Sequence, residues 1–420
     1  MRLSGRPAVA IAALTVALAA CTSSAPHVPA PRSAPAGPVV SSVAAPGCST
    51  AAAPGRQLPP GLARLSSVPG DPFGVAATAD GRWSFVALLP TGGSGAVGVF
   101  ADTGSAPPRL VRQIPVSGQP LGVALTPDGR YLLAANGSGA TVVSVPAAEQ
   151  GSGNAVLGTL SGGGGGAIEV ATSRDGRFAF VSLEDSDRIA VFNLQQALAS
   201  HFRTSGFVGD VPAGIAPVGL AVSPDGDWLY STSELRSRSE VQRASHHGQL
   251  SLSLGGGQGT LAVISVHKAE TDPAHAIVST VTAGCSPVRV ITSKSGGTVW
   301  VTARESDVLL GFSASRLRDD LAHALIARVE VGEAPVGLAL VDAGQRVVVA
   351  DSNRFGHAGA KSSLAVVNVA SAMAHQPALA GYLPAGGFPR QMALEPNGHV
   401  LLVTDFSSEQ LETVNVTNLP

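Results

Sequence analysis

A repeat with a period near 48 residues constrains the fold of this 420-residue chain more than any other feature. Its clearest copy runs from Pro217 to Thr232, with the sequence Pro-Val-Gly-Leu-Ala-Val-Ser-Pro-Asp-Gly-Asp-Trp-Leu-Tyr-Ser-Thr. Six further segments match it, and a shared turn glycine falls at Gly81, Gly129, Gly176, Gly226, Gly296, Gly344 and Gly398. The successive spacings are 48, 47, 50, 70, 48 and 54 residues. A nearly fixed period of this size indicates an array of one supersecondary unit.

Each unit predicts four strands. In the fourth copy these are residues 220–223, 228–232, 260–266 and 277–281, all rich in β-branched and apolar side chains. An Asp-Gly pair joins the first two strands, which is a hairpin signal because both residues tolerate the positive φ of a tight turn. Four antiparallel strands without interleaved helices form the blade of a β-propeller. The chain is therefore predicted to be all-β, with seven blades.

The two ends of the repeat region predict how the ring closes. The seventh repeat contains three strands, at residues 391–395, 400–404 and 411–416, before the sequence stops at Pro420. A strand at residues 63–68 precedes the first repeat, where a fourth strand belongs. We expect this N-terminal strand to complete the last blade, because closure removes an exposed sheet edge.

The repeat motif, Pro-x-Gly-x-Ala-x-Ser-Pro-Asp-Gly followed by a strand similar to Tyr-Val-Thr-Asn, resembles the YVTN/YncE-like propellers. These overlap in fold with the lactonase-type seven-bladed propellers. The resemblance covers roughly residues 62 to 416. It implies the propeller fold, and as one possible activity the hydrolysis of lactones. The motif is a folding motif, so it does not choose among functions.

The first residues have the pattern of an export signal. Arg2 and Arg6 precede an uncharged run from Ala8 to Ala20, which ends in Leu-Ala-Ala-Cys at Cys21. This resembles the bacterial lipobox, so we expect a signal peptide at 1–20, lipidation of Cys21 and a location outside the cytoplasm at the bacterial cell membrane. The alternative is an ordinary cleaved signal with a chance cysteine. Residues 21–61, rich in Ala, Pro and Ser, predict a tether, and residues 62–420 the propeller.

Two further cysteines, Cys48 and Cys285, remain for other chemistry. An oxidising compartment permits a disulfide between them, which would clip the end of the tether to the propeller. Two free thiols, or a bond to another chain, are the alternatives. The spacing of the cysteines does not decide among these.

One repeat position departs from its consensus in a way that suggests a site. The glycine of Pro-x-Gly is retained in four repeats, whereas the other three have Glu169, Arg289 and Gln391, with Arg390 beside the last. Large polar side chains at the start of the innermost strand would converge on the channel. They form a ligand site, a buried ion pair or a solvated rim. If these residues form a ligand site, the catalytic candidates are Glu169, Arg289, Arg304 and Glu305.

A second set of polar residues follows the second strand of six repeats. It comprises Asn136, Glu184, Glu234, Arg304, Glu305, Asp351 and Asp405. We expect these residues to surround the channel mouth as a polar crown, which either holds a polar ligand or is merely hydrated. Two insertions decorate the same face: residues 235–258, with His246 and His247, and residues 352–357, with Arg354. Adjacent histidines without a nearby carboxylate are a weak metal signal, so no metal is predicted.

The remaining patterns narrow the functional classes. A net charge of −2 and the lack of a basic stripe with aromatics disfavour nucleic acid as a partner. Nucleophile-elbow, zinc and phosphate-loop motifs are absent, and no cofactor is predicted. Loops near residues 195–204, 315–324 and 369–376 predict short helices on the face opposite the mouth. We expect a monomeric binding or scaffolding propeller for a small molecule, glycan or protein; the alternative is a lactonase-type hydrolase using Arg and Glu side chains at the mouth.

Overall fold

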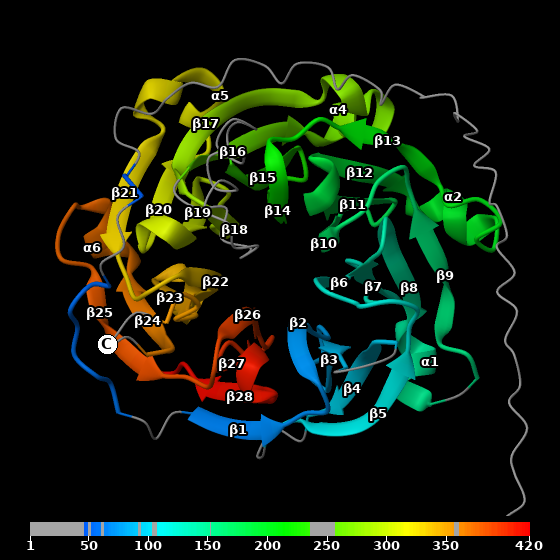
Figure 1. Cartoon of the computed structure of the whole chain (residues 1–420), viewed down its shortest axis with the longest axis horizontal. Coiled ribbons are helices and arrows are strands. Elements are labelled where there is room, and N and C mark those ends of the chain that lie inside the picture. Colours follow the sequence, from blue (N-terminus) through cyan, green and yellow to red (C-terminus); the bar gives the residue numbers. More distant parts are fainter. Residues whose placement is uncertain are drawn as a thin grey trace, which may run out of the picture. The chain divides into compact units, whose positions relative to one another are not determined.

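A computed structural model describes residues 46–48, 52–59, 63–90, 94–102, 107–151, 153–235, 257–356 and 361–420. The described residues belong to one compact unit, in which seven four-stranded antiparallel sheets are arranged as a ring (Figure 1). The predicted seven-bladed propeller is confirmed. The innermost strands of the blades surround the ring axis.

The strands of the first four blades follow one another along the chain. Blade 1 contains β2 (Asp71–Ala77), β3 (Trp83–Leu89), β4 (Ala96–Ala101) and β5 (Arg109–Pro115), and blade 2 contains β6 (Val123–Leu125), β7 (Tyr131–Asn136), β8 (Gly139–Ser144) and β9 (Val156–Ser161). Blade 3 contains β10 (Ala167–Thr172), β11 (Phe178–Leu183), β12 (Arg188–Asn193) and β13 (Phe207–Val211), and blade 4 contains β14 (Ile215–Val222), β15 (Trp228–Leu235), β16 (Gln258–Ser265) and β17 (Ile277–Cys285).

The strands of blades 5 and 6 also follow one another along the chain, whereas blade 7 includes the N-terminal strand. Blade 5 contains β18 (Pro287–Thr292), β19 (Thr298–Ala303), β20 (Val308–Ser313) and β21 (Leu325–Glu330), and blade 6 contains β22 (Pro335–Val341), β23 (Arg346–Asp351), β24 (Ser363–Asn368) and β25 (Leu379–Pro384). Blade 7 contains β26 (Pro389–Leu394), β27 (Val400–Asp405), β28 (Gln410–Asn415) and the N-terminal β1 (Ala63–Ser67). In Figure 1 the blue β1 lies beside the red β28, which confirms the predicted closure.

The turn between the first and second strand recurs with the same chemistry. The shared glycine has positive φ in all seven blades, from 67° at Gly81 to 92° at Gly344, a region that an L side chain enters only with strain. In blade 1 the Thr78 hydroxyl donates to Asp80 over 2.6 Å, and Thr126 and Asp128 repeat this contact in blade 2. The Asp carboxylate therefore holds the chain reversal that the Asp-Gly motif predicts.

A buried hydroxyl connects each of several blades to the next one. Thr302 on β19 donates to the carbonyl of Val336 on β22 over 2.7 Å, and accepts from the backbone N–H of Arg289 in its own blade. The same contact recurs at Ser182, Thr232 and Thr404, and that of Thr404 reaches Phe73 and so joins blade 7 to blade 1. These bonds satisfy backbone groups where the innermost strands separate from one another.

A segment of the predicted tether is attached to the propeller. Cys48 and Cys285 form a disulfide with a Cα–Cα distance of 5.3 Å, which decides among the alternatives left open by the sequence. Residues 46–48 and 52–59 are here called the strap. The carbonyl of Gly47 accepts a hydrogen bond from the Ser306 hydroxyl over 3.0 Å, and Gln57 forms a parallel bridge with Tyr382 on β25, the outer strand of blade 6. The Tyr382 hydroxyl donates to the carbonyl of Ala53 over 2.7 Å. The attachment therefore begins before the predicted propeller boundary at residue 62.

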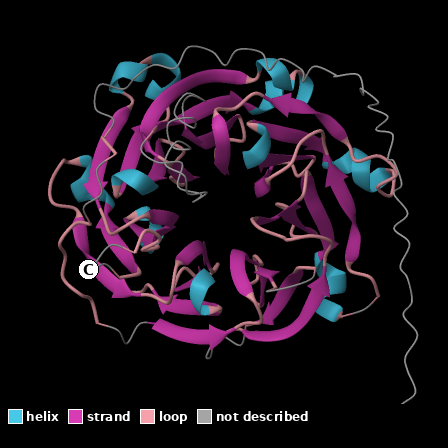
Figure 2. Cartoon of the chain, viewed as in Figure 1, coloured by secondary structure: helices cyan, strands magenta, loops and turns pink. Residues whose placement is uncertain are grey.

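Short helices follow the third strand of five blades and lie at the periphery of the ring (Figure 2). The predicted helical loops contain α2 (Leu194–Ala199), α5 (Arg316–Asp319) and α6 (Val369–Met373); α1 (Val145–Gln150) and α4 (Val266–Thr271) were not predicted. Ser144 and Ser265 cap the latter two helices at their N-termini. None of the helices in the described part of the chain is long and apolar enough to span a membrane.

Candidate functional site

A pocket of about 580 Å³ lies at the end of the channel where the second strands lead into the third strands, which is the face predicted for the mouth. We call it the mouth pocket. The short connections that line it include η2 (Glu184–Ser186), η4 (Arg304–Ser306) and η7 (Phe406–Ser408). In the described residues its charged and aromatic lining divides into three groups around the ring.

The acidic arc, Glu184, Asp185, Asp187 and Glu234, comes from blades 3 and 4. Burial raises the pKa of Glu184 to about 7, and the negative charge of Glu234 adds to the shift. Asp187 Oδ1 accepts a hydrogen bond from the backbone N–H of Ala216 over 3.0 Å, so this carboxylate also joins its connection in blade 3 to β14 of blade 4. Glu184 is half-buried and lines open space, which is the environment of a carboxyl group that titrates near neutrality.

The basic arc, Arg304, Arg354 and Arg390, comes from blades 5, 6 and 7. Arg304 is almost fully buried, and its Nη2 donates to Glu234 Oε2 over 3.0 Å and to Ser286 Oγ over 3.2 Å. Neither Arg354 nor Arg390 forms an ion pair with any residue in the described part of the chain. Burial lowers the pKa of both guanidinium groups, and neighbouring arginine charges lower them further.

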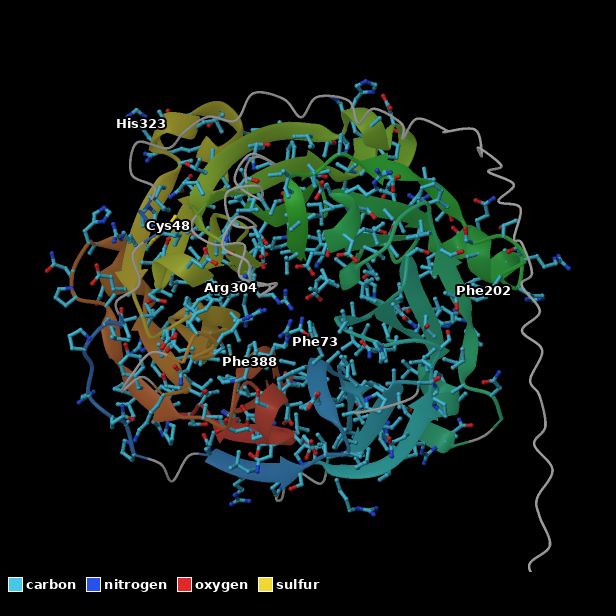
Figure 3. The ribbon with its side chains drawn as sticks, viewed as in Figure 1. Cys48, Phe73, Phe202, Arg304, His323 and Phe388 are labelled. Atoms are coloured by element: carbon cyan, nitrogen blue, oxygen red, sulfur yellow. A yellow bond between two sulfur atoms is a disulfide. The ribbon has the colours of Figure 1, made fainter. Side chains whose placement is uncertain are left out.

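The phenylalanine patch, Phe73, Phe388 and Phe406, supports the basic arc from below. The Arg390 guanidinium carbon lies 3.7 Å from the centre of the Phe73 ring and 5.3 Å from those of Phe388 and Phe406. Arg354 lies 6.0 Å from the centre of the Phe388 ring. Figure 3 shows Phe73, Phe388 and Arg304 near the centre of the ring. Cation–π contacts hold the guanidinium groups without neutralising their charge.

The axial cluster, Glu169, Arg289 and Gln391, unites the three side chains that replace the consensus glycine. Gln391 Nε2 donates to Glu169 Oε2 over 2.8 Å, and Arg289 Nη2 lies 3.4 Å from the same oxygen. Glu169 and Arg289 are each 6% exposed, and none of the three lines the mouth pocket. Burial raises the pKa of Glu169, and the Arg289 charge opposes the shift. Of the alternatives for this position, the geometry matches the buried ion pair.

The predicted polar crown divides into two groups that differ by one residue in strand register. Asp351 and Asp405 pair with the proline that starts strand one, whereas Glu184, Glu234 and Arg304 come one position later. Because strand side chains alternate in direction, this shift turns them to opposite sides. Asp351 and Asp405 are fully buried and do not line the mouth pocket.

Asp351 and Asp405 instead pack against the connection that enters their own blade. A Cβ placed on Gly332 would come within 2.4 Å of the Asp351 carboxylate, and Gly386 stands in the same relation to Asp405. Asn136 contacts the equivalent connection in blade 2 by donating to the carbonyl of Ser117. Burial raises the pKa of Asp351, and raises that of Asp405 to about 9 together with the nearby charge of Glu412.

Comparison with known families places the fold among characterised propellers. A family model described as lactonase, 7-bladed beta-propeller matches residues 91–354, more than half of the chain. The chain belongs to this lactonase family. No curated protein matches it. Among solved structures, a chain of the hydrazine synthase of Kuenenia stuttgartiensis is similar with a TM-score of 0.61 and 15% identity, over 84% of this chain and 97% of that one.

A second similar structure is a chain of the mitotic checkpoint complex, with a TM-score of 0.62 and 14% identity over 84% of this chain and 93% of that one. At such identities the similarity shows the fold of this lactonase-family chain alone. The chemistry of its mouth pocket has to be argued from its own residues.

The remaining predicted site residues lie in different parts of this lactonase-family propeller. Arg354 and Arg390 line the mouth pocket, whereas Glu305 is buried and does not contribute to the described lining. His246 and His247 lie outside the described residues. Sequence reasoning missed the phenylalanine patch. Phe406 occupies the same register position as Glu184 and Arg304, so counting from the strand-one proline would have identified it.

Proposed function

We propose that the mouth pocket binds a small organic anion that carries an apolar group, so that this propeller is a binding module. The observation that carries the proposal is the pair Arg354 and Arg390: both line the pocket, and neither has a carboxylate partner among the described residues. An arginine fork matches a carboxylate or phosphate and stacks on aromatic rings. The phenylalanine patch adds an apolar surface for the rest of the ligand.

The unfavourable crowding of arginine charges at the pocket supports the proposal. Arg289, Arg304 and Arg354 all lower the pKa of Arg390, so four arginines share one partly desolvated region. Acidic partners neutralise Arg289 and Arg304. Like charges brought together away from water are unfavourable unless a counter-charge joins them. A bound anion would supply that charge.

Arg390→Met tests the proposal with phenylacetate as the probe and isothermal titration calorimetry as the assay. Loss of a charge-assisted hydrogen bond predicts an affinity at least about 10-fold weaker, while the Met side chain still packs on Phe73. Arg328→Met is the matched control, because it removes an equal charge from an exposed position on β21. Equal affinity in wild type and Arg390→Met, or no binding by the wild type, would overturn the proposal.

A second candidate function, hydrolysis of lactones, is favoured by Glu184, whose pKa of about 7 suits a general base. Glu184 would take a proton from water as the water oxygen attacks the lactone carbonyl, with Arg390 near the developing oxyanion. The ring C–O bond then breaks, and the alkoxide receives a proton to give a hydroxy acid. Glu169 and Arg289, the earlier candidates, do not line the mouth pocket.

The test of this candidate is turnover of a panel of sugar and acyl lactones. Glu184→Gln should lower kcat at least about 100-fold, as expected for loss of a general base. Glu149→Gln is the control, since Glu149 is a partly buried carboxyl on α1 away from the mouth pocket. No turnover by the wild type would remove the hydrolase from consideration and leave the binding module.

We also propose that the propeller is held outside the cytoplasm by a lipid on Cys21. The disulfide between Cys48 and Cys285 supports this placement, because such bonds persist in oxidising compartments. Cys21→Ala should move the protein from the membrane fraction to the soluble fraction. Unchanged membrane association of this variant would refute the anchor.

A further inference from the structure

The charges of the mouth pocket are sorted by position around the ring. The acidic arc belongs to blades 3 and 4, and the basic arc belongs to blades 5, 6 and 7. In a ring of seven blades, blade 3 stands opposite blades 6 and 7. Glu184 and Asp185 therefore face Arg354 and Arg390 across the channel axis. The phenylalanine patch, on blades 7 and 1, lies beside the basic arc.

The axial cluster sets the scale of this separation. Gln391 Nε2 in β26 lies 2.8 Å from Glu169 Oε2 in β10, so side chains of blades 3 and 7 are in contact across the channel axis at the level of the axial cluster. Glu184 follows β11, the neighbour of β10, and Arg390 precedes Gln391. At the level of these two side chains the channel is open, and among the described residues Glu184 pairs with no arginine. The mouth pocket, with a volume of about 580 Å³, has room for one small molecule between them.

Charged side chains without an ion pair among the described residues remain on both sides of the pocket. Glu234 is neutralised by Arg304 over 3.0 Å, a contact that joins the two arcs. This leaves Glu184 and Asp185 on one side, and Arg354 and Arg390 on the other, without ion pairs in the described part of the chain. An anion would satisfy the second side only. Electrostatic complementarity favours a ligand with both charges.

We propose that the ligand is a zwitterion with its charges at opposite ends and an apolar body, such as a short apolar peptide with free termini. Its carboxylate binds Arg354 and Arg390, its ammonium group binds Glu184 and Asp185, and an apolar side chain packs on the phenylalanine patch. This inference rests on the proposed anion binding and adds a cationic group that Glu184 recognises.

The test is calorimetric titration with the dipeptide Leu-Phe, its N-acetyl form and its C-terminal amide. The unmodified dipeptide should bind best, and each modification should weaken binding by roughly 10-fold or more, since each removes a charge-assisted hydrogen bond. In Glu184→Gln the preference for the free over the acetylated dipeptide should shrink markedly, because only Asp185 remains to bind the ammonium group. Glu149→Gln, the control, should keep the wild-type difference between them.

Each alternative outcome has a distinct meaning. If the acetylated dipeptide binds wild type as tightly as the free one, the zwitterion inference fails and anion binding stands. If the amide binds as tightly as the free dipeptide, both proposals fail. If none of the three binds, the zwitterion inference fails, and the titration with phenylacetate decides the anion proposal. If Glu184→Gln leaves the preference for the free dipeptide intact, the assignment of Glu184 fails; a thermal melt verifies that this variant is folded.

Discussion

Neutralising Glu169 should destabilise the propeller strongly, although the side chain resembles a catalytic carboxylate in sequence. Glu169→Gln keeps the shape of the side chain and removes only its charge. Arg289 is 6% exposed, and its guanidinium group makes no hydrogen bond within the described residues beyond the 3.4 Å ion pair. Breaking a buried pair from one side typically costs about 3–5 kcal/mol.

The structure indicates the lower end of that range, about 3 kcal/mol, because the new amide can still bond to Gln391 and to Arg289. With a urea m-value of about 3 kcal/mol per molar, the unfolding midpoint should fall by about 1 M. The measurement is equilibrium urea unfolding followed by tryptophan fluorescence and circular dichroism. Both probes are needed to show that the transition remains cooperative.

A double-mutant cycle separates charge pairing from packing. Arg289→Met alone should destabilise because Glu169 then lacks its counter-ion, whereas the double variant should recover to within about 1 kcal/mol of the wild type, as uncharged replacements of buried pairs do. A midpoint for Glu169→Gln equal to that of the wild type, or a double variant no better than the sum of the singles, would refute the reading of the axial cluster as an ion pair.

Four further predictions concern other parts of the ring. Because Glu184 has a raised pKa of about 7, its contribution to stability is present at low pH and is lost as the pH rises from about 4.3 to 7; Glu184→Gln should therefore lose less stability between pH 5 and pH 8 in urea titrations. Asp405→Asn should melt higher than the wild type by a margin that grows as the pH rises from about 3.9 to 9, because Asp405, with its pKa of about 9, stays protonated in the fold while the unfolded chain ionises; the two proteins should melt alike near about pH 3. Thr302→Val leaves two buried backbone groups without a partner and should cost about 2–3 kcal/mol in urea unfolding. Cys285→Ser opens a disulfide that spans 237 residues, so chain entropy predicts a loss of up to about 5 kcal/mol, measurable as a lower melting temperature that the reductant-treated wild type shares.

The fold could be predicted from the sequence because the strands, the turns and the ring closure each correspond to a pattern within a short stretch of the chain. Alternating apolar residues predict the strands, and the Asp-Gly pairs at Gly129 and Gly226 predict their turns. The absent fourth strand of blade 7 predicts closure by β1. The strap was predicted only in part: its disulfide from Cys48 to Cys285 was one of the alternatives, whereas the backbone contacts of residues 52–59 with Tyr382 follow no apolar pattern.

The candidate site was accessible only in part. Comparing the repeats identified Glu169, Arg289 and Gln391 as unusual, but only the ring brings blades 3, 5 and 7 together at one point. Their contact is a matter of tertiary geometry, and no spacing along the chain encodes it. The helices α1 and α4 were missed for a related reason: at six residues each they are too short to show a helical period.

The division of the polar crown shows how a repeat protein separates structure from chemistry within two adjacent positions. The residue opposite the strand-one proline, Asp351 or Asp405, points into the blade and holds the incoming connection. The next residue, such as Glu184 or Arg304, points to the mouth pocket. The first position must suit its own blade, whereas the second can differ from blade to blade without disturbing the sheet. Because the second position can vary, the side chains around the pocket change from acidic to basic to aromatic from blade to blade. This variation among blades, rather than any single residue, gives the mouth its two opposed charges.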